Sequence, residues 1–117
     1  MYNQRKNQDL RIYRKRSQLT QIQLAFLFGL AENTNICHWE SGRREPDSNI
    51  LLLYHLLFEL PVETTVHAGC RNETITALTG KTEQLLAQLK EGRSTQKGLV
   101  RIAFLEAVLS RFSAQQV

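Results

Sequence analysis

Two short helices with a turn between them are predicted by residues 19–46, which read LTQIQLAFLFGLAENTNICHWESGRREP. Thr20 suits the N-cap of the first helix, because its hydroxyl can accept a hydrogen bond from a backbone N–H of the first turn. That helix stops at Gly29, since glycine readily takes the left-handed conformation that closes a helix. The second helix covers roughly Asn33–Ser41 and stops at Gly42 in the same way.

The second helix carries two different faces. Ile36 and Trp39, three residues apart, form a ridge that can be buried. The opposite side carries short or polar side chains, where an ordinary surface helix would carry Lys, Glu and Arg. Such side chains can approach base edges closely and form hydrogen bonds there, although a merely polar, solvent-exposed helix is the alternative. They are Thr34, Cys37, His38 and Ser41, with Asn35 on one flank.

Helices are also predicted on both sides of this unit. Residues Asp9–Arg16 form one, with an apolar stripe on its inner side. Asp47 can cap another over Ser48–Leu60, which is apolar around most of its circumference and must therefore be covered on two sides. Pro61 then starts a short helical turn or a new helix at Val62.

The C-terminal part of the chain predicts a helical hairpin. From Glu73 onward, mainly apolar residues follow at intervals of 3, 4, 3 and 4, the seam of a helix that packs lengthwise on another helix. A break at 91–95 precedes a final helix over about Gln96–Phe112. The seam can either join two copies of the chain or pack within the chain on the helix Ser48–Leu60. Its members are Ile75, Leu78, Thr82, Leu85 and Leu89.

Two motifs together carry a resemblance to a known family. A helix that opens with Leu19-Thr20-Gln21 and ends at Gly29 is followed by Trp39-Glu40-Ser41-Gly42-Arg43-Arg44-Glu45-Pro46. Short helix, glycine, short helix is also the connection of a helix-turn-helix unit. In this combination the chain resembles the phage-repressor/Cro family, also called XRE-like, over about Asp9–Glu63. The interval from Gly29 to Ile36 is similar to that of a subgroup with one extra residue at the start of the recognition helix.

The resemblance implies an all-α fold in two parts. Residues 1–66 would form a five-helix, repressor-like helix-turn-helix domain that binds DNA. Residues 67–117 would form the C-terminal helical hairpin, a region for dimerisation or for binding a partner protein.

The resemblance also assigns parts to individual residues. The Gln that opens the second helix, here Gln21, would touch the phosphate backbone and support the third helix, which enters the major groove. Arg43 and Arg44, in the segment after the third helix, would meet phosphates. Residues early on the third helix would read bases, and here these are Asn33, Thr34, Asn35 and His38.

The distribution of charge favours an anionic partner. The 117-residue chain has a formal net charge of +4, and its first residues contain a basic cluster opposed only by Asp9. Within this cluster, Arg14 and Arg16 are predicted as further contacts to the DNA backbone, although a solvated helix face is the alternative. The cluster consists of Arg5, Lys6, Arg11, Arg14, Lys15 and Arg16.

Several classes of protein are disfavoured by what the sequence lacks. No apolar stretch reaches the roughly 18 residues of a membrane-spanning helix, and no signal-peptide segment is seen, so we expect a cytoplasmic protein. Cys37 and Cys70 are the two cysteines, and His67 with Cys70 lacks the second ligand pair of a metal site, so no metal or other cofactor is expected. No nucleophile elbow, glycine-rich phosphate loop or HExxH motif suggests an enzyme.

A transcriptional regulator that binds double-stranded DNA at specific sequences is therefore the predicted function. A homodimer on an inverted repeat would place two recognition helices about one turn of DNA apart, roughly 34 Å. The alternative is an antitoxin-like or adaptor protein of the same fold, whose C-terminal helices bind a partner protein.

Overall fold

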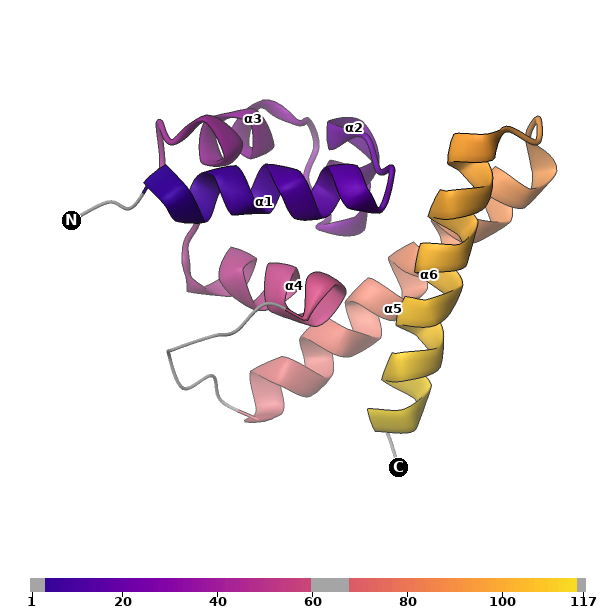
Figure 1. Ribbon diagram of the computed structural model, residues 1–117. Helices are drawn as coiled ribbons and strands as arrows, with labels where there is room; N and C mark the ends of the chain where they lie inside the picture. Colours follow the sequence, from indigo (N-terminus) through magenta and orange to yellow (C-terminus); the bar gives the residue numbers. More distant parts are fainter. Residues whose placement is uncertain (1–3, 60–67, 116–117) are drawn as a thin grey trace.

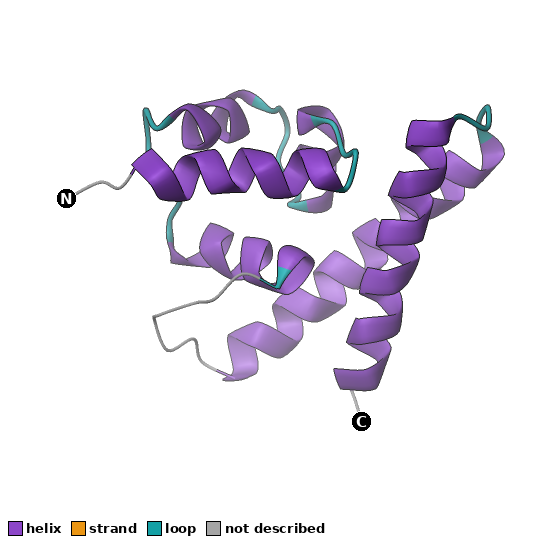
Figure 2. Ribbon diagram, viewed as in Figure 1, coloured by secondary structure: helices purple, strands orange, loops and turns teal. Residues whose placement is uncertain are grey.

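The computed structural model describes residues 4–59 and 68–115, and every regular element in these ranges is a helix (Figure 1). Figure 2 shows the same view with helices and loops distinguished. The predicted all-α class is thus confirmed. None of the described helices is both long and apolar enough to cross a membrane. These helices are α1 (Gln4–Arg16), α2 (Gln21–Leu27), α3 (Thr34–Ser41), α4 (Ser48–Phe58), α5 (Ala68–Glu91) and α6 (Gln96–Gln115).

One expected helix and the end of another fall outside the described residues. Leu60, expected as the last residue of the fourth helix, and the helical turn expected at Pro61 and Val62 belong to residues 60–67. The described helix α4 ends at Phe58 and is followed by Glu59 in the left-handed conformation, with φ 60°. Helices α1 to α4 are therefore the described part of the five helices predicted for residues 1–66.

The ends of α2 and α3 follow the cap residues that the sequence supplies. Thr20 and Gln23 form a reciprocal capping box, in which the Gln23 N–H donates to Thr20 Oγ1 at 3.0 Å and the Thr20 N–H donates to Gln23 Oε1 at 2.9 Å. Gly29 and Gly42 follow α2 and α3 with φ of 72° and 85°, a region that glycine occupies without steric cost. The predicted bounds of both helices agree closely with the structure.

The helices form one packed unit (Figure 1). Helix α1 lies alongside α3, and α2 packs against both α3 and α5. Helix α5 also contacts α4 and pairs with α6 in an antiparallel hairpin. The buried side chains of the N-terminal helices and of the hairpin belong to a single core cluster.

A chain of aromatic rings runs through this core from α2 to α6. Phe28 and Tyr54 meet edge to face with centroids 5.0 Å apart, Tyr54 and Phe58 stack at 6.0 Å, and Phe58 and Phe104 stack at 5.6 Å. The two middle rings come from α4. The buried residues of α4 are spread around most of its circumference, so the expectation that this apolar helix is covered on two sides is confirmed; they are Ile50, Leu52, Tyr54, Leu56 and Leu57.

The seam on α5 is buried inside the chain. Ile75, Leu78 and Leu85 are buried there together with Thr82, where α5 packs against α2, α4 and α6. The fully buried Thr82 hydroxyl donates to the Leu78 carbonyl at 2.7 Å, which satisfies this polar group inside the core. Of the two interpretations that the spacing left open, the structure has the intramolecular one, and α2 and α6 share in the packing with α4.

Two arginines attach α6 to the N-terminal helices. Arg101 Nε donates to the carbonyl of Gln18 in the turn between α1 and α2. Arg111 Nη2 donates to the carbonyls of Leu56 and Leu57, at the C-terminal end of α4, where a cation also complements the helix dipole. The two arginines are separated by about 15 Å along the helix at 1.5 Å per residue. Helix α6 is therefore held at two points, one of them beside the start of α2.

Candidate nucleic-acid interface

Helix α3 separates a buried side from an exposed side. Ile36 and Trp39 are buried, as predicted, and Glu40 is buried with them. The side chains of Thr34 and Asn35 are exposed, and so are those of Cys37 and Ser41 on the same helix. A short helix with small and polar groups facing outward is thus firmly anchored by its opposite side.

The four residues proposed to read bases are not equivalent. Thr34 and Asn35 are exposed in the first turn of α3. Asn33 is half-buried at the N-cap position, and its Nδ2 donates to Gln21 Oε1 at 3.1 Å, which ties it to α2. His38 is half-buried, and its Nδ1 is buried without a hydrogen-bond partner among the described residues. Thr34 and Asn35 are therefore the two most accessible members of the set.

Gln21 connects the start of α2 to both ends of α3. Its Oε1 accepts the hydrogen bond from Asn33, and its Nε2 donates to Glu40 Oε1 at 3.2 Å. The side-chain amide therefore has one partner near the N-terminus of α3 and another near its C-terminus. Gln21 does contact the third helix, as predicted; its contact with a phosphate stays a prediction.

Arg14 lies elsewhere than we expected. Its Nε and Nη2 donate to Glu40 Oε2 and Oε1 at 2.6 and 2.9 Å, and its Nη1 donates to the Leu19 carbonyl at 3.0 Å. The residue is only 9% exposed, because it lies between α1 and α3. A guanidinium used in this way holds two helices together, so Arg14 is left out of the proposed phosphate contacts.

Sequence reasoning gave no part to Glu40, although it closes a network that joins three helices. Arg14 on α1, Glu40 on α3 and Gln21 on α2 are linked by direct hydrogen bonds, and Asn33 extends the network to the start of α3. The available signal was its position four residues after Ile36, which places it on the inner side of the helix. A carboxylate on that side needs a buried cationic partner.

Tyr54 lies in the electrostatic field of this ion pair. Burial raises the pKa of the Tyr54 phenol well above its ordinary value of 10.0, Glu40 raises it further, and Arg14 acts in the opposite direction. The hydroxyl has no hydrogen-bond partner among the described residues. The neutral phenol is therefore the form that this core accommodates.

Exposed basic side chains lie in the loop after α3 and at the end of α1. Arg43 and Arg44 are exposed in the loop after α3, where their backbone N–H groups donate to the His38 carbonyl at 3.0 and 3.4 Å and fold the loop back on the helix. Arg16 is exposed at the end of α1, with its guanidinium 5.9 Å from the Tyr13 ring centroid. Figure 1 shows the end of α1 and the loop after α3 toward opposite ends of the α1 and α3 pair.

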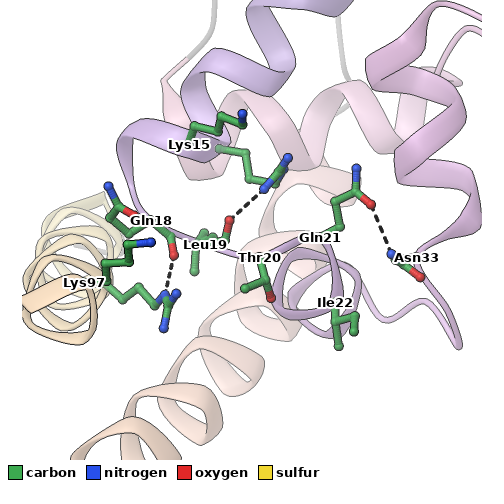
Figure 3. A pocket seen from close by; sticks show the side chains of 10 residues that line it. Lys15, Gln18, Leu19, Thr20, Gln21, Ile22, Asn33 and Lys97 are labelled. Carbon is green, nitrogen blue, oxygen red and sulfur yellow. Dashed lines mark hydrogen bonds between the residues drawn. The ribbon is translucent and has the colours of Figure 1, made fainter. Parts of the chain in front are cut away.

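Further basic residues, none of them among the DNA contacts predicted from the sequence, lie around the turn between α1 and α2. Lys15, Lys97 and Arg101 line a pocket together with Gln21 and Asn33 (Figure 3). A signal was present, because Lys97 and Arg101 are four residues apart and share a face of the predicted last helix. The sequence did not reveal that this face lies beside the start of α2.

The residues considered as metal ligands are mostly outside the described part of the chain. His67 and the side chain of Cys70 are not described. Within the described residues, no group of three or more His, Cys, Asp or Glu side chains could hold a metal ion. Cys37 carries a free, exposed thiol.

Comparisons with known proteins give no relative: no family model, no curated protein and no solved structure matches this chain. What the chain does must therefore be inferred from its own residues.

Proposed function

We propose that this protein is a sequence-specific regulator of transcription that binds double-stranded DNA through α2 and α3, used as a helix-turn-helix unit of the phage-repressor/Cro type. One observation carries the proposal. Helix α3 buries Ile36 and Trp39 against the core while Thr34 and Asn35 stay exposed in its first turn. A helix presented in this way has the size and the donor and acceptor groups to read base edges in the major groove.

The hydrogen-bond network of α3 supports this proposal, because base reading requires a fixed helix orientation. Gln21 bonds to Asn33 and Glu40, and Glu40 bonds to Arg14, so α3 is fixed to α2 and α1 by charged and amide groups of defined geometry. Specific contacts lose affinity when the side chains that make them can shift. In the proposed complex, Asn35 reads a base edge and the network keeps it in register.

The flanking cations would supply affinity that is independent of sequence. Arg16, Arg43 and Arg44 are exposed, and Arg43 and Arg44 lie in the loop directly after α3. Contacts to phosphates release condensed counterions, so the logarithm of the binding constant falls with the logarithm of the salt concentration by about 0.9 per phosphate contact. The two groups of residues would therefore divide the work, with α3 discriminating and the arginines binding the backbone.

We also propose that two copies bind one inverted repeat. A single small helix-turn-helix unit contacts one half-site, and two-fold symmetry would place the second unit about one turn of DNA away, roughly 34 Å. The seam on α5 is buried within the chain, so the second copy would meet a different surface. Sedimentation of the protein with and without a duplex would give the number of chains bound.

Selection of bound duplexes from a random-sequence pool tests the proposed function directly. We expect enrichment of an inverted repeat, and binding that weakens steeply with added salt. A pool that returns no enriched sequence, with no duplex retained at roughly 50 mM salt, would leave the proposal without support.

A second candidate is an antitoxin-like or adaptor protein, and one observation favours it. Leu99 and Val100 on α6 are 57% and 41% exposed, which is a position where a partner protein could bind. Capture of one protein at defined stoichiometry, abolished by Leu99→Ser, with no duplex binding in parallel gel-shift assays, would favour this candidate over DNA binding.

A further inference from the structure

A basic pocket opens where the turn between α1 and α2 meets the first turns of α6 (Figure 3). Its volume is about 620 Å³. The lining comes from the end of α1, the start of α2, the N-cap of α3 and the start of α6. The lining residues are Arg14, Lys15, Gln18, Leu19, Thr20, Gln21, Ile22, Asn33, Lys97 and Arg101.

The charged residues that line the pocket are all basic. Four of its ten lining residues are basic and none is acidic. Glu40, which does not line the pocket, pairs with Arg14 and neutralises its charge. Lys15, Lys97 and Arg101 are therefore the cations that a ligand would meet. The positive charges around the pocket repel each other, and a bound anion would offset this repulsion because it attracts all of them. The arrangement therefore suits an oxyanion better than a neutral ligand.

Arg101 is oriented for such a contact. Its Nε donates to the carbonyl of Gln18, another lining residue, which holds the guanidinium at the pocket wall. A guanidinium has five N–H donors, so the four on its terminal nitrogens are not used by this bond. A planar group held by one edge matches two oxygens of a phosphate. Lys97, four residues earlier on α6, adds a mobile point charge on the same face.

We infer that Lys15, Lys97 and Arg101 hold a backbone phosphate of duplex DNA, so that α6 is part of the DNA interface. This inference rests on the proposed function, because Gln21 and Asn33 belong both to the pocket and to the proposed reading surface. A phosphate bound here would flank the bases that α3 reads. The C-terminal hairpin would thus lengthen the DNA site instead of serving only for protein contacts.

The salt dependence of binding tests the inference with variants that should fold. Lys97 is exposed, so Lys97→Ala removes a charge without removing a core contact. Binding of the duplex selected from the random pool is measured by fluorescence anisotropy over roughly 50 to 200 mM salt. A plot of the logarithm of the binding constant against the logarithm of the salt concentration gives a slope, and the magnitude of this slope should fall by about 0.9 for one lost phosphate contact. Lys97→Arg should restore the slope. Lys90→Ala, at an exposed lysine of α5 outside the pocket, is the matched control.

Duplexes shortened from each end one base pair at a time locate the phosphate. The wild-type protein should lose affinity at one particular step, and Lys97→Ala should show no loss at that step because the contact is already missing. Sequence preference should be the same in both proteins, since phosphate contacts carry no base information.

The possible outcomes separate this inference from the proposed function. If the wild-type protein binds the duplex and Lys97→Ala keeps its full slope, or Lys90→Ala changes the slope equally, the pocket is not a phosphate contact and the proposed function stands. If the wild-type protein binds no duplex, both fail. A second source of the same chemistry is free phosphate. If inorganic phosphate raises the Tm of the wild type but not of Lys97→Ala, and the duplex slope is unaffected, the pocket binds small phosphates instead.

Discussion

Arg14 and Glu40, 26 residues apart in the sequence, form a buried ion pair with two hydrogen bonds of 2.6 and 2.9 Å. The pair joins α1 to α3, and Gln21 extends it to α2. Because the exposed side of α3 is opposite to the side that carries Glu40, the orientation of this surface depends on the pair. The pair is thus a structural device that serves the candidate interface without contacting a ligand.

Removing one member of the pair should destabilise the protein strongly. Glu40→Gln keeps the size and a hydrogen-bond acceptor but leaves the Arg14 charge buried without its counterion. We expect the free energy of unfolding in urea to fall by about 3 kcal/mol. Replacing both residues, as Arg14→Met with Glu40→Leu, should cost less than the sum of the single changes. Strictly additive losses would show that the two groups are not coupled.

Tyr54 should make the stability sensitive to alkaline pH. Because burial, reinforced by Glu40, raises the pKa of its phenol above 10.0, the unfolded chain loses this proton before the folded chain does. Below about pH 10 the phenol is protonated in both states, and the free energy of unfolding does not depend on its titration. Above about pH 10 the free energy of unfolding falls by up to about 1.4 kcal/mol per pH unit, until the pH reaches the pKa of the phenol in the folded protein.

Tyr54→Phe isolates this effect from the other groups that titrate at high pH. The variant should match or exceed the wild type at pH 7, since it removes a buried hydroxyl without a hydrogen-bond partner among the described residues. Its advantage should then grow as the pH rises above about 10. Urea unfolding curves at several pH values give this difference, and a difference independent of pH would contradict the shifted pKa.

Local features of the fold could be predicted from the sequence, because each needs only neighbouring residues. Thr20 caps a helix through its own first turn, and Gly42 ends one through its own backbone. The buried ridge of α3 follows from helical spacing alone. The sequence therefore predicted these helix ends correctly, and also the exposed side of α3 with the exception of His38, which is half-buried.

Features that depend on distant partners could not be predicted. Arg14 and Arg16 belong to the same basic cluster. Arg14 lies four residues after the buried Leu10 and shares its face of α1, but its bonds to Glu40 depend on how α1 packs on α3. The place of Lys97 and Arg101 beside α2 likewise requires knowledge of how α6 packs. The spacing of the α5 seam suits packing between two chains as well as packing within one chain, so it could not distinguish the two arrangements.

Two glycines offer a matched test of backbone conformation. A Cβ added to Gly80 or to Gly29 would meet no atom within 4 Å, so neither substitution causes a clash. Gly80 lies within α5, and Gly80→Ala should raise the free energy of unfolding by about 1 kcal/mol through helix propensity. Gly29 has φ 72°, so Gly29→Ala should lower it by about 1 kcal/mol. Equal effects of both changes in thermal or urea unfolding would show that conformation is not the deciding factor.

Arg43→Ala and Asn35→Ala should separate affinity from sequence preference in the proposed DNA complex. Both side chains are exposed, so either variant should keep its stability within about 0.5 kcal/mol. Arg43→Ala should weaken binding to all duplexes alike and reduce the salt slope by about 0.9. Asn35→Ala should keep that slope and lose about 1 to 3 kcal/mol on the selected sequence only, if it contacts a base with two hydrogen bonds. Anisotropy titrations of each variant with the selected duplex and with a scrambled one measure both quantities. Uniform losses from both variants on both duplexes would contradict the division of work between α3 and the loop that follows it.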